Sequence, residues 1–167
     1  NESLALHSAT TPALSYTPGQ GEGWNMVGNP YPSAIDADDF TTTNIDEAVY
    51  AYDGSTGQYL SWNGAIGSLT DGIIPPMNGF FVKASGDAPS ITIPLSSRLH
   101  TSAAFLKDKP EVPDVLHLTV KKDGLTDHTF ISYSKNATMN FDSQCDAYKL
   151  FGAQHMPQLY SITPDAI

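Results

Sequence analysis

The chain has 167 residues, 40% of them hydrophobic, and its 13 glycines and 12 prolines break the apolar positions into short runs, which favours an all-β class over long helices. Eighteen acidic against eight basic residues give a formal net charge of -10, so the field of the protein repels phosphate backbones and anionic lipid, and we expect no nucleic-acid partner. No window reaches the roughly 20 apolar residues that a membrane-spanning helix needs, which argues against membrane insertion.

The first predicted strand covers residues 24–28, Trp-Asn-Met-Val-Gly, and ends at a glycine. The Asn-Pro-Tyr-Pro-Ser loop at residues 29–33 is rigid, because each proline fixes its own φ and keeps the preceding residue out of the helical region. We therefore expect its tyrosine to be buried in a fixed corner. Residues 36–40 follow as one helical turn, with Ser33 or Asp36 accepting hydrogen bonds from its free amides.

A hairpin is predicted from residues 48–53 and 58–62, joined by Asp-Gly-Ser-Thr-Gly, where glycine supplies a positive φ. Residues 79–83 and 90–95 are further strand candidates.

A proline bend precedes the strand at 79–83. We expect Ile73, Ile74 and Met77 to enclose its two prolines, so that Phe80 and Phe81 reach opposite faces of that strand.

The second half of the chain begins after a charged, proline-bearing stretch at residues 107–113, which we interpret as a linker. Strands at 115–121 and 127–133 follow, too few to close a sandwich alone. The sequence therefore predicts a β-sandwich module at 1–106 and the opening strands of a second, incomplete sandwich at 114–167. One single sandwich over 1–167 is the alternative.

Three blocks of the chain carry a family resemblance: GWNMVGNPYPSAID at 23–36, IPPMNGFFV at 74–82 and FDSQCDAYKL at 141–150. In this order and spacing they resemble a signature of large secreted bacterial proteins that use type IX secretion, often labelled adhesins. The resemblance covers most of the chain, from Gly23 to about Tyr160. It implies an antiparallel, jelly-roll-like β-sandwich on the outer cell surface or outside the cell, just upstream of a C-terminal sorting domain, with no catalytic residues.

Residue patterns for catalysis are sparse. The sequence has no Gly-x-Ser-x-Gly elbow, no His-Glu-x-x-His and no phosphate-cradling glycine loop. Cys145 with His155 as base is conceivable, but the neighbouring Asp146 disfavours a thiolate, so an inert, packed cysteine is the better interpretation. We expect a protein that is not an enzyme.

Metal ligands and cofactors are not expected, and a chelator should leave the melting temperature unchanged. The five histidines share no metal-ligand spacing, although His117 and His128 fall in paired strand candidates. Two acidic clusters are weak calcium candidates, yet a structural role in capping turns is favoured for both. The clusters consist of Asp36, Asp38 and Asp39, and of Asp142 and Asp146, the last of which could also pair with Lys149.

Aromatic side chains in the loop and hairpin region are the remaining lead, because flat rings suit sugar faces and partner proteins. The ligand-binding candidates are Tyr31, Tyr52, Tyr59 and Trp62. Trp62 lies between a serine and an asparagine and is expected to be partly exposed, whereas Trp24, Phe80 and Phe81 have the apolar neighbours of core residues.

The sequence thus predicts a non-enzymatic structural or adhesive module of a secreted cell-surface protein. Its expected partners are other domains of the same protein, and a cell-surface or host protein or glycan. A carbohydrate-binding module that uses exposed aromatics is the alternative, and an accessory part of a secreted hydrolase is the weaker one.

Overall fold

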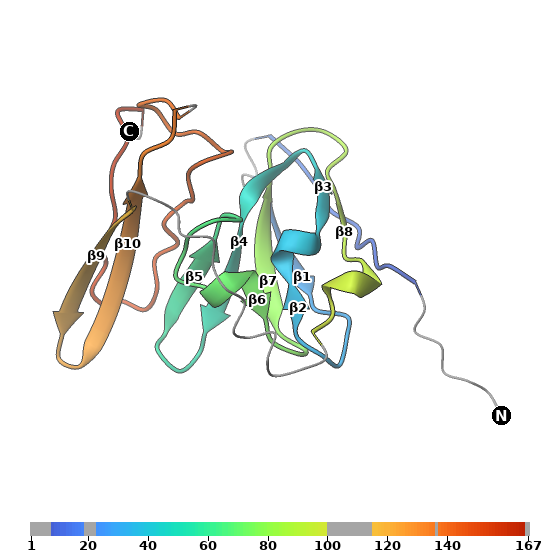
Figure 1. Ribbon diagram of the computed structural model, residues 1–167, viewed down its shortest axis with the longest axis horizontal. Helices are drawn as coiled ribbons and strands as arrows, with labels where there is room; N and C mark the ends of the chain where they lie inside the picture. The colour runs from blue at the N-terminus through green and yellow to red at the C-terminus, as the bar shows by residue number, and fades with distance from the viewer. Residues whose placement is uncertain (1–7, 19–22, 100–114, 136, 166–167) are drawn as a thin grey trace.

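The computed structural model describes residues 8–18, 23–99, 115–135 and 137–165, and within this part of the chain the regular structure is strands with short 3-10 turns (Figure 1). The strands are β1 (Trp24–Gly28), β2 (Ile35–Asp36), β3 (Thr41–Thr43), β4 (Ile45–Asp53), β5 (Gln58–Trp62), β6 (Ile73–Ile74), β7 (Gly79–Ala84), β8 (Ser90–Thr92), β9 (Val115–Lys122) and β10 (Leu125–Ser132). The turns are η2 (Ala37–Asp39), η3 (Thr70–Gly72) and η4 (Leu95–Ser97). All the pairings between strands are antiparallel, so the prediction of an antiparallel, sandwich-like all-β fold is confirmed.

One four-stranded sheet, in the order β1-β7-β4-β5, forms the main layer. The short pairs β2-β6 and β3-β8 are separate two-stranded sheets, and their residues Ile35, Ile74 and Ile91 share one buried cluster with residues of the main sheet. The core is formed by this cluster of buried residues, which runs from Val27 to Ile93. Phe80 in β7 is fully buried, next to Val27 in β1 and Ala51 in β4 by register, because successive side chains of a strand alternate between faces.

The Asn-Pro-Tyr-Pro loop is fixed from two sides. The Asn29 side chain donates to the carbonyls of Ser33 and Pro75 at 2.9 Å each, and its oxygen accepts from the Tyr31 amide at 2.9 Å. The Tyr31 hydroxyl donates to the Ile93 carbonyl at 3.1 Å. Tyr31 is 2% exposed, so the expectation of a buried, fixed corner is confirmed.

The predicted hairpin and bend are also present. β4 and β5 pair as expected, and Asp53 accepts hydrogen bonds from Ser55 and Thr56 in the turn that joins them. Phe80 is buried on the inner face, and Phe81 is half-buried on the outer face. The expectation for Met77 is wrong: it is 87% exposed, because the chain turns there with a positive φ of 58° and carries the side chain outwards.

The hairpin β9-β10 is a separate two-stranded sheet beside β5 (Figure 1). The apolar core described above contains no residue of this hairpin. The predicted linker at 107–113 lies outside the described residues, and the division into 1–106 and 114–167 stays a prediction.

Candidate functional site

A bridging segment, residues 141–160, runs without regular structure between the hairpin and the four-stranded sheet (Figure 1). It hydrogen-bonds to the sheet region through backbone groups: the Glu47 amide donates to the Ser143 carbonyl at 3.2 Å, and the Ala153 amide donates to the Gly57 carbonyl at 2.9 Å. The Asn63 side chain also donates to the carbonyl of Cys145 at 3.0 Å. The segment therefore lies against the sheet along much of its length.

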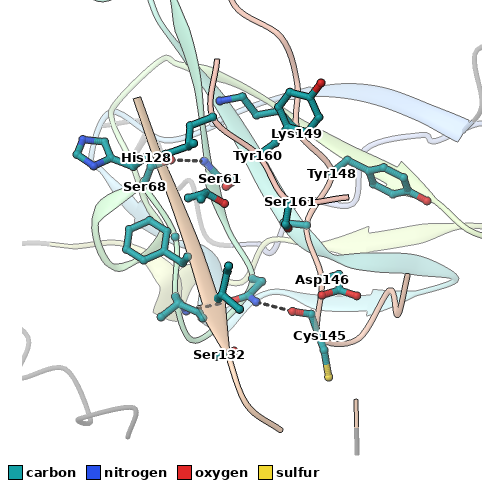
Figure 2. A pocket seen from close by; sticks show the side chains of 18 of the residues that line it. Ser61, Ser68, His128, Ser132, Cys145, Asp146, Tyr148, Lys149, Tyr160 and Ser161 are labelled. Atoms are coloured by element: carbon teal, nitrogen blue, oxygen red, sulfur yellow. Dashed lines mark hydrogen bonds between the residues drawn. The ribbon is translucent and has the colours of Figure 1, made fainter. Parts of the chain in front are cut away.

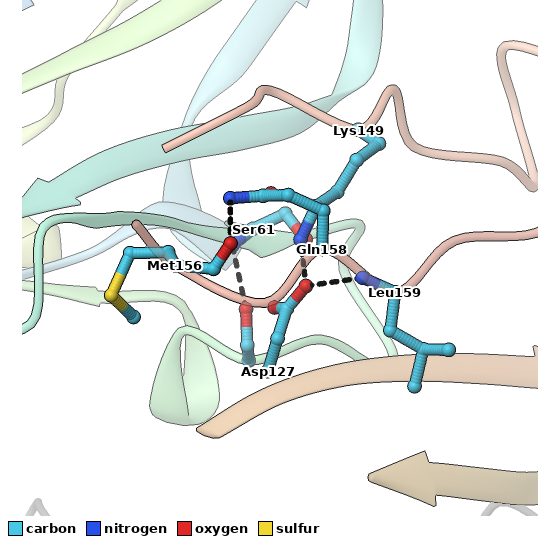
Figure 3. A network of polar contacts seen from close by, with 7 residues as sticks. Ser61, Asp127, Lys149, Met156, Gln158 and Leu159 are labelled. Atoms are coloured by element: carbon cyan, nitrogen blue, oxygen red, sulfur yellow. Dashed lines mark hydrogen bonds and ion pairs between the residues drawn. The ribbon is translucent and has the colours of Figure 1, made fainter. Parts of the chain in front are cut away.

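Asp127 of β10 is the anchor on the hairpin side. One of its carboxylate oxygens, Oδ2, accepts from the Lys149 ammonium at 2.5 Å and from the Leu159 amide at 2.6 Å (Figure 3). The two charged side chains are 7% and 19% exposed. Hydrogen bonds to ionised groups in such a shielded place are stronger than those between neutral groups, so this carboxylate holds two points of the segment at once.

Tyr148 is the anchor on the sheet side. Its amide donates to the Tyr50 hydroxyl at 2.8 Å, and its ring contacts Trp24 edge-on at 6.0 Å between centroids. The Lys83 ammonium lies 4.3 Å from the centre of the same ring and donates to its hydroxyl at 3.1 Å. The side chain thus combines ring packing with a cation–π contact.

Two buried groups of the sheet have shifted pKa values beside this anchor. Burial raises the pKa of Tyr50 above its ordinary value of 10.0, against the opposing effect of the Tyr148 amide. Burial also raises the pKa of Asp46, and Lys83, whose ammonium is 4.0 Å away, opposes this shift.

Neighbouring residues therefore bind opposite partners. Tyr148 packs on the sheet and Lys149 pairs with the hairpin, and their side chains point to different sides of the segment (Figure 2). Extended backbone alternates its side chains in this way. Consecutive residues can consequently hold two β units together without regular structure of their own.

The cleft between hairpin and sheet is small and mostly polar. It encloses about 210 Å³ and is lined by β5, β10 and the bridging segment, including Ser61, His128, Tyr148 and Tyr160 (Figure 2). Sites for drug-sized ligands enclose roughly 300–1,000 Å³ and are mainly apolar. The cleft is better described as the interface between the hairpin, the sheet and the bridging segment than as a ligand pocket.

Trp62 is not partly exposed, and that expectation is corrected. It is 5% exposed, because its register opposite Val49 places it on the inner face of the sheet. Its indole nitrogen donates to Asp38 at 2.7 Å. Gly72 lies against the indole ring so closely that a Cβ there would stand 2.5 Å from a ring carbon. The expectation of exposure rested on the polar sequence neighbours of Trp62. Neighbours along a strand point to the opposite face, so they do not report on the face that Trp62 itself occupies.

The other aromatic candidates lie on both faces. Tyr31 is in the core, whereas Tyr52 and Tyr59 face each other on the outer face of β4 and β5, with ring centroids 5.1 Å apart. Phe81 extends this row, 5.9 Å from Tyr59. Tyr52 is 46% exposed, so of the predicted platform Tyr52 and Tyr59 are within reach of a ligand. Together with Phe81, which was expected in the core but is only half-buried, they form an aromatic strip.

The aspartate candidates have hydrogen-bonding roles in turns. Asp36 accepts from the Asp38 amide at the start of η2, and Asp142 accepts from the Gln144 amide while Asp146 accepts from the Asp142 amide. Asp39 is exposed. Among the described residues no group of three or more His, Cys, Asp or Glu side chains is placed to hold a metal ion.

Cysteine and histidine residues complete the candidates. Cys145 is a half-buried free thiol in the bridging segment, and His155 is exposed. His117 and His128 do meet across the hairpin, with Nε2 and Nδ1 2.8 Å apart.

Sequence reasoning missed the bridge itself. It paired Lys149 with Asp146 as one alternative and assigned no role to Asp127 or Tyr50. The available signal was the Asp-Ala-Tyr-Lys-Leu block at 146–150, which carried the family resemblance without showing what its tyrosine and lysine contact.

Within the described part of the chain, no helix has the length and apolar character required to cross a membrane. Comparison of the chain with protein-family models, with curated proteins and with solved structures gave no match.

Proposed function

We propose that this chain is a non-enzymatic structural or adhesive module of a secreted cell-surface protein. The observation that supports this best is the pair of anchors at Tyr148 and Lys149, which fixes a β-hairpin against a sandwich through a segment with little regular structure. A module that holds neighbouring domains at a set spacing needs such a joint. The resemblance of its three sequence blocks to secreted adhesin-like proteins supports the extracellular or outer-surface location.

The hairpin supplies a surface for a neighbour. Leu116, Leu118 and Ile131 share one face of β9-β10 and are 54%, 39% and 44% exposed. β9 is also an edge strand of its sheet. Exposed apolar groups beside an unpaired edge are typical of surfaces that another β element covers. We propose another domain of the same secreted protein as that element.

Hydrogen exchange tests this role. The amides of β9 should be at least about tenfold better protected in the full secreted protein than in the isolated chain, because a covering strand or sheet slows local opening. The amides of β1 serve as the internal control and should not change. Equal protection of β9 in both forms would count against the role.

Labelling of intact producing cells with an antibody against the chain tests the location, and staining only after lysis would contradict it.

Carbohydrate binding is the second candidate, and the aromatic strip of Tyr52, Tyr59 and Phe81 favours it. Flat aromatic rings can pack against the apolar face of a sugar ring. A glycan array should then give a specific signal that Tyr52→Ala abolishes. Tyr133→Ala is the matched control, since Tyr133 is 77% exposed outside the strip. If the unaltered chain gives no signal on the array, carbohydrate binding is rejected and the spacer role remains. Release of sugars from the array would instead favour the weaker hydrolase-associated alternative.

A further inference from the structure

Two histidines meet on the face of the hairpin opposite Asp127. His117 in β9 and His128 in β10 are diagonal neighbours, since the register pairs His128 with Thr119. The separation of their ring nitrogens, Nε2 and Nδ1, is 2.8 Å, and the Thr119 hydroxyl lies 3.1 Å from the His128 nitrogen and 3.5 Å from that of His117. Two nitrogens and one oxygen that could ligate a metal therefore lie within 3.5 Å of one another.

The spacing of the two nitrogens fits the bite of a metal ion. Bonds from imidazole nitrogen to zinc are about 2.0–2.1 Å long, which puts two nitrogens at a right angle about 2.9 Å apart and two at a tetrahedral angle about 3.4 Å apart. The observed 2.8 Å is close to the right-angle value. Right angles between ligands are the preference of Cu²⁺ and Ni²⁺, which also bind imidazole well.

We propose that His117 and His128 form a two-nitrogen chelate for a divalent transition-metal ion, with Cu²⁺ and Ni²⁺ preferred over Zn²⁺. On metal binding, the ring that donates the hydrogen bond between the pair changes tautomer: its proton moves to its other ring nitrogen, and both facing nitrogens present lone pairs to the ion. Thr119 holds a coordinated water molecule or supplies a weak third contact. This site is independent of the structural or adhesive role proposed above.

The rings are held in place before a metal arrives. His117 stacks on Phe130, with centroids 4.3 Å apart and planes 15° from parallel, and the ladder between β9 and β10 fixes both backbones. Groups held in their bound geometry lose less conformational entropy on binding. The pair is thus a better chelate than two histidines on free chain would be.

Access and charge permit binding. Both rings line an open groove of about 530 Å³ between the hairpin and the β4-β5 turn, which Asp53 also lines, so the remaining coordination positions face solvent. Burial lowers the pKa of His128; His117, Lys121 and Lys149 act in the same direction, and Asp127 opposes them. Metal binding requires the neutral form of both imidazoles, so the affinity should fall as pH drops and protons compete. The two lysines weaken the attraction for a cation, while the overall charge of -10 favours it.

The test is titration of the chain with Cu²⁺ and Ni²⁺ by calorimetry, with electron paramagnetic resonance of the copper form. Two variants are matched: one with His117→Gln and His128→Gln, and one with His7→Gln, His100→Gln and His155→Gln, which keeps the pair alone. The pair-only variant should bind one ion with two-nitrogen coupling in the spectrum. The pairless variant should lose at least about tenfold in affinity, because even removal of groups that support a metal ligand costs about that much.

Circular dichroism of both variants verifies that each is folded, and Thr119→Val gives a second, conservative readout in which two-nitrogen coupling persists. Any of three results would overturn the proposal. They are an unchanged affinity in the pairless variant, a loss of binding in the pair-only variant, and a copper spectrum without two equivalent nitrogens.

Discussion

The region from Trp24 to Leu99 and the region from Val115 to Asp165 are both built around antiparallel strands, but different forces hold them. In the first, the buried residues form one apolar cluster, with Phe80, Ile35, Ile74, Ile91 and Ile93 fully enclosed. In the second, Leu116, Leu118 and Ile131 are exposed, and the most buried groups include the charged Asp127. The first region stabilises itself by burial, whereas in the second the β9-β10 hairpin is held in place by a few polar contacts with the bridging segment.

This difference predicts different responses to perturbation. Apolar burial is non-directional and changes little with pH. A polar anchor depends on one geometry, and the Tyr50 hydroxyl anchor depends on protonation as well. Loss of a core residue should therefore unfold the sandwich, and loss of an anchor should release the hairpin while the sandwich stays folded.

The largest expected effect comes from the core. Phe80→Ala should lower the free energy of unfolding by about 3–5 kcal/mol, because it leaves a cavity at a fully buried position. Urea denaturation followed by tryptophan fluorescence measures the loss. Met77→Ala, at an 87% exposed position, is the control and should change little. A small loss for Phe80→Ala would show that the sandwich is not held by this core.

The hairpin anchor should give the next largest effect. Asp127→Ala leaves the Lys149 ammonium without its partner, and breaking such a buried pair costs about 3 kcal/mol. The loss should be local: hydrogen exchange at the Leu159 amide should accelerate strongly, while exchange in β7 should not. Asp87→Ala removes an exposed carboxylate and serves as the control. Unchanged exchange at Leu159 would contradict the anchor role.

The sheet anchor should make stability sensitive to alkali. Because burial raises the pKa of Tyr50 in the folded state, its contribution is complete below the unfolded value near 10 and is lost as pH rises above it. Tyr50→Phe should remove this alkaline loss and cost about 1 kcal/mol at neutral pH, since the Tyr148 amide loses its acceptor. Thermal melts from pH 7 to 11 measure both. The idea fails if the two proteins lose stability in parallel above pH 10.

The smallest expected effect lies in the β4-β5 turn. Hydrogen bonds from Ser55 and then Thr56 hold the pKa of Asp53 below its ordinary value. Its contribution is therefore present above the unfolded value and is lost as pH falls through the lowered folded value. Ser55→Ala should raise the pKa of Asp53 in an NMR titration with little change in stability, because these hydrogen bonds lie at the surface. A pKa that does not move would reject this account of the turn.

Much of the first region could be predicted from the sequence. Glycine and proline mark its turns, and the alternation around Phe80 and Phe81 sets the faces of β7. Trp62 is the instructive failure there. Its two neighbours are polar, yet strand geometry sends neighbours to the opposite face, and its own polar atom is satisfied by Asp38.

The second region was predicted only in its strands. The bridge depends on contacts between residues far apart in the chain: Tyr50 with Tyr148 and Asp127 with Lys149. Nothing local distinguishes such residues, because any aspartate in a strand and any lysine in a loop could remain solvated. The meeting of His117 and His128 was foreseeable from strand pairing, but their separation required the actual register.

If the bridging segment holds the hairpin at a fixed distance from the sandwich, a spin-label distance measurement should show it. Labels on Thr42→Cys in β3 and Lys122→Cys in β9, both exposed positions, in a Cys145→Ser background, report that distance by pulsed electron resonance. We predict one narrow distance distribution, which Asp127→Ala broadens while the sandwich stays folded. A distribution in the otherwise unaltered chain as broad as that of the Asp127→Ala variant would contradict the claim.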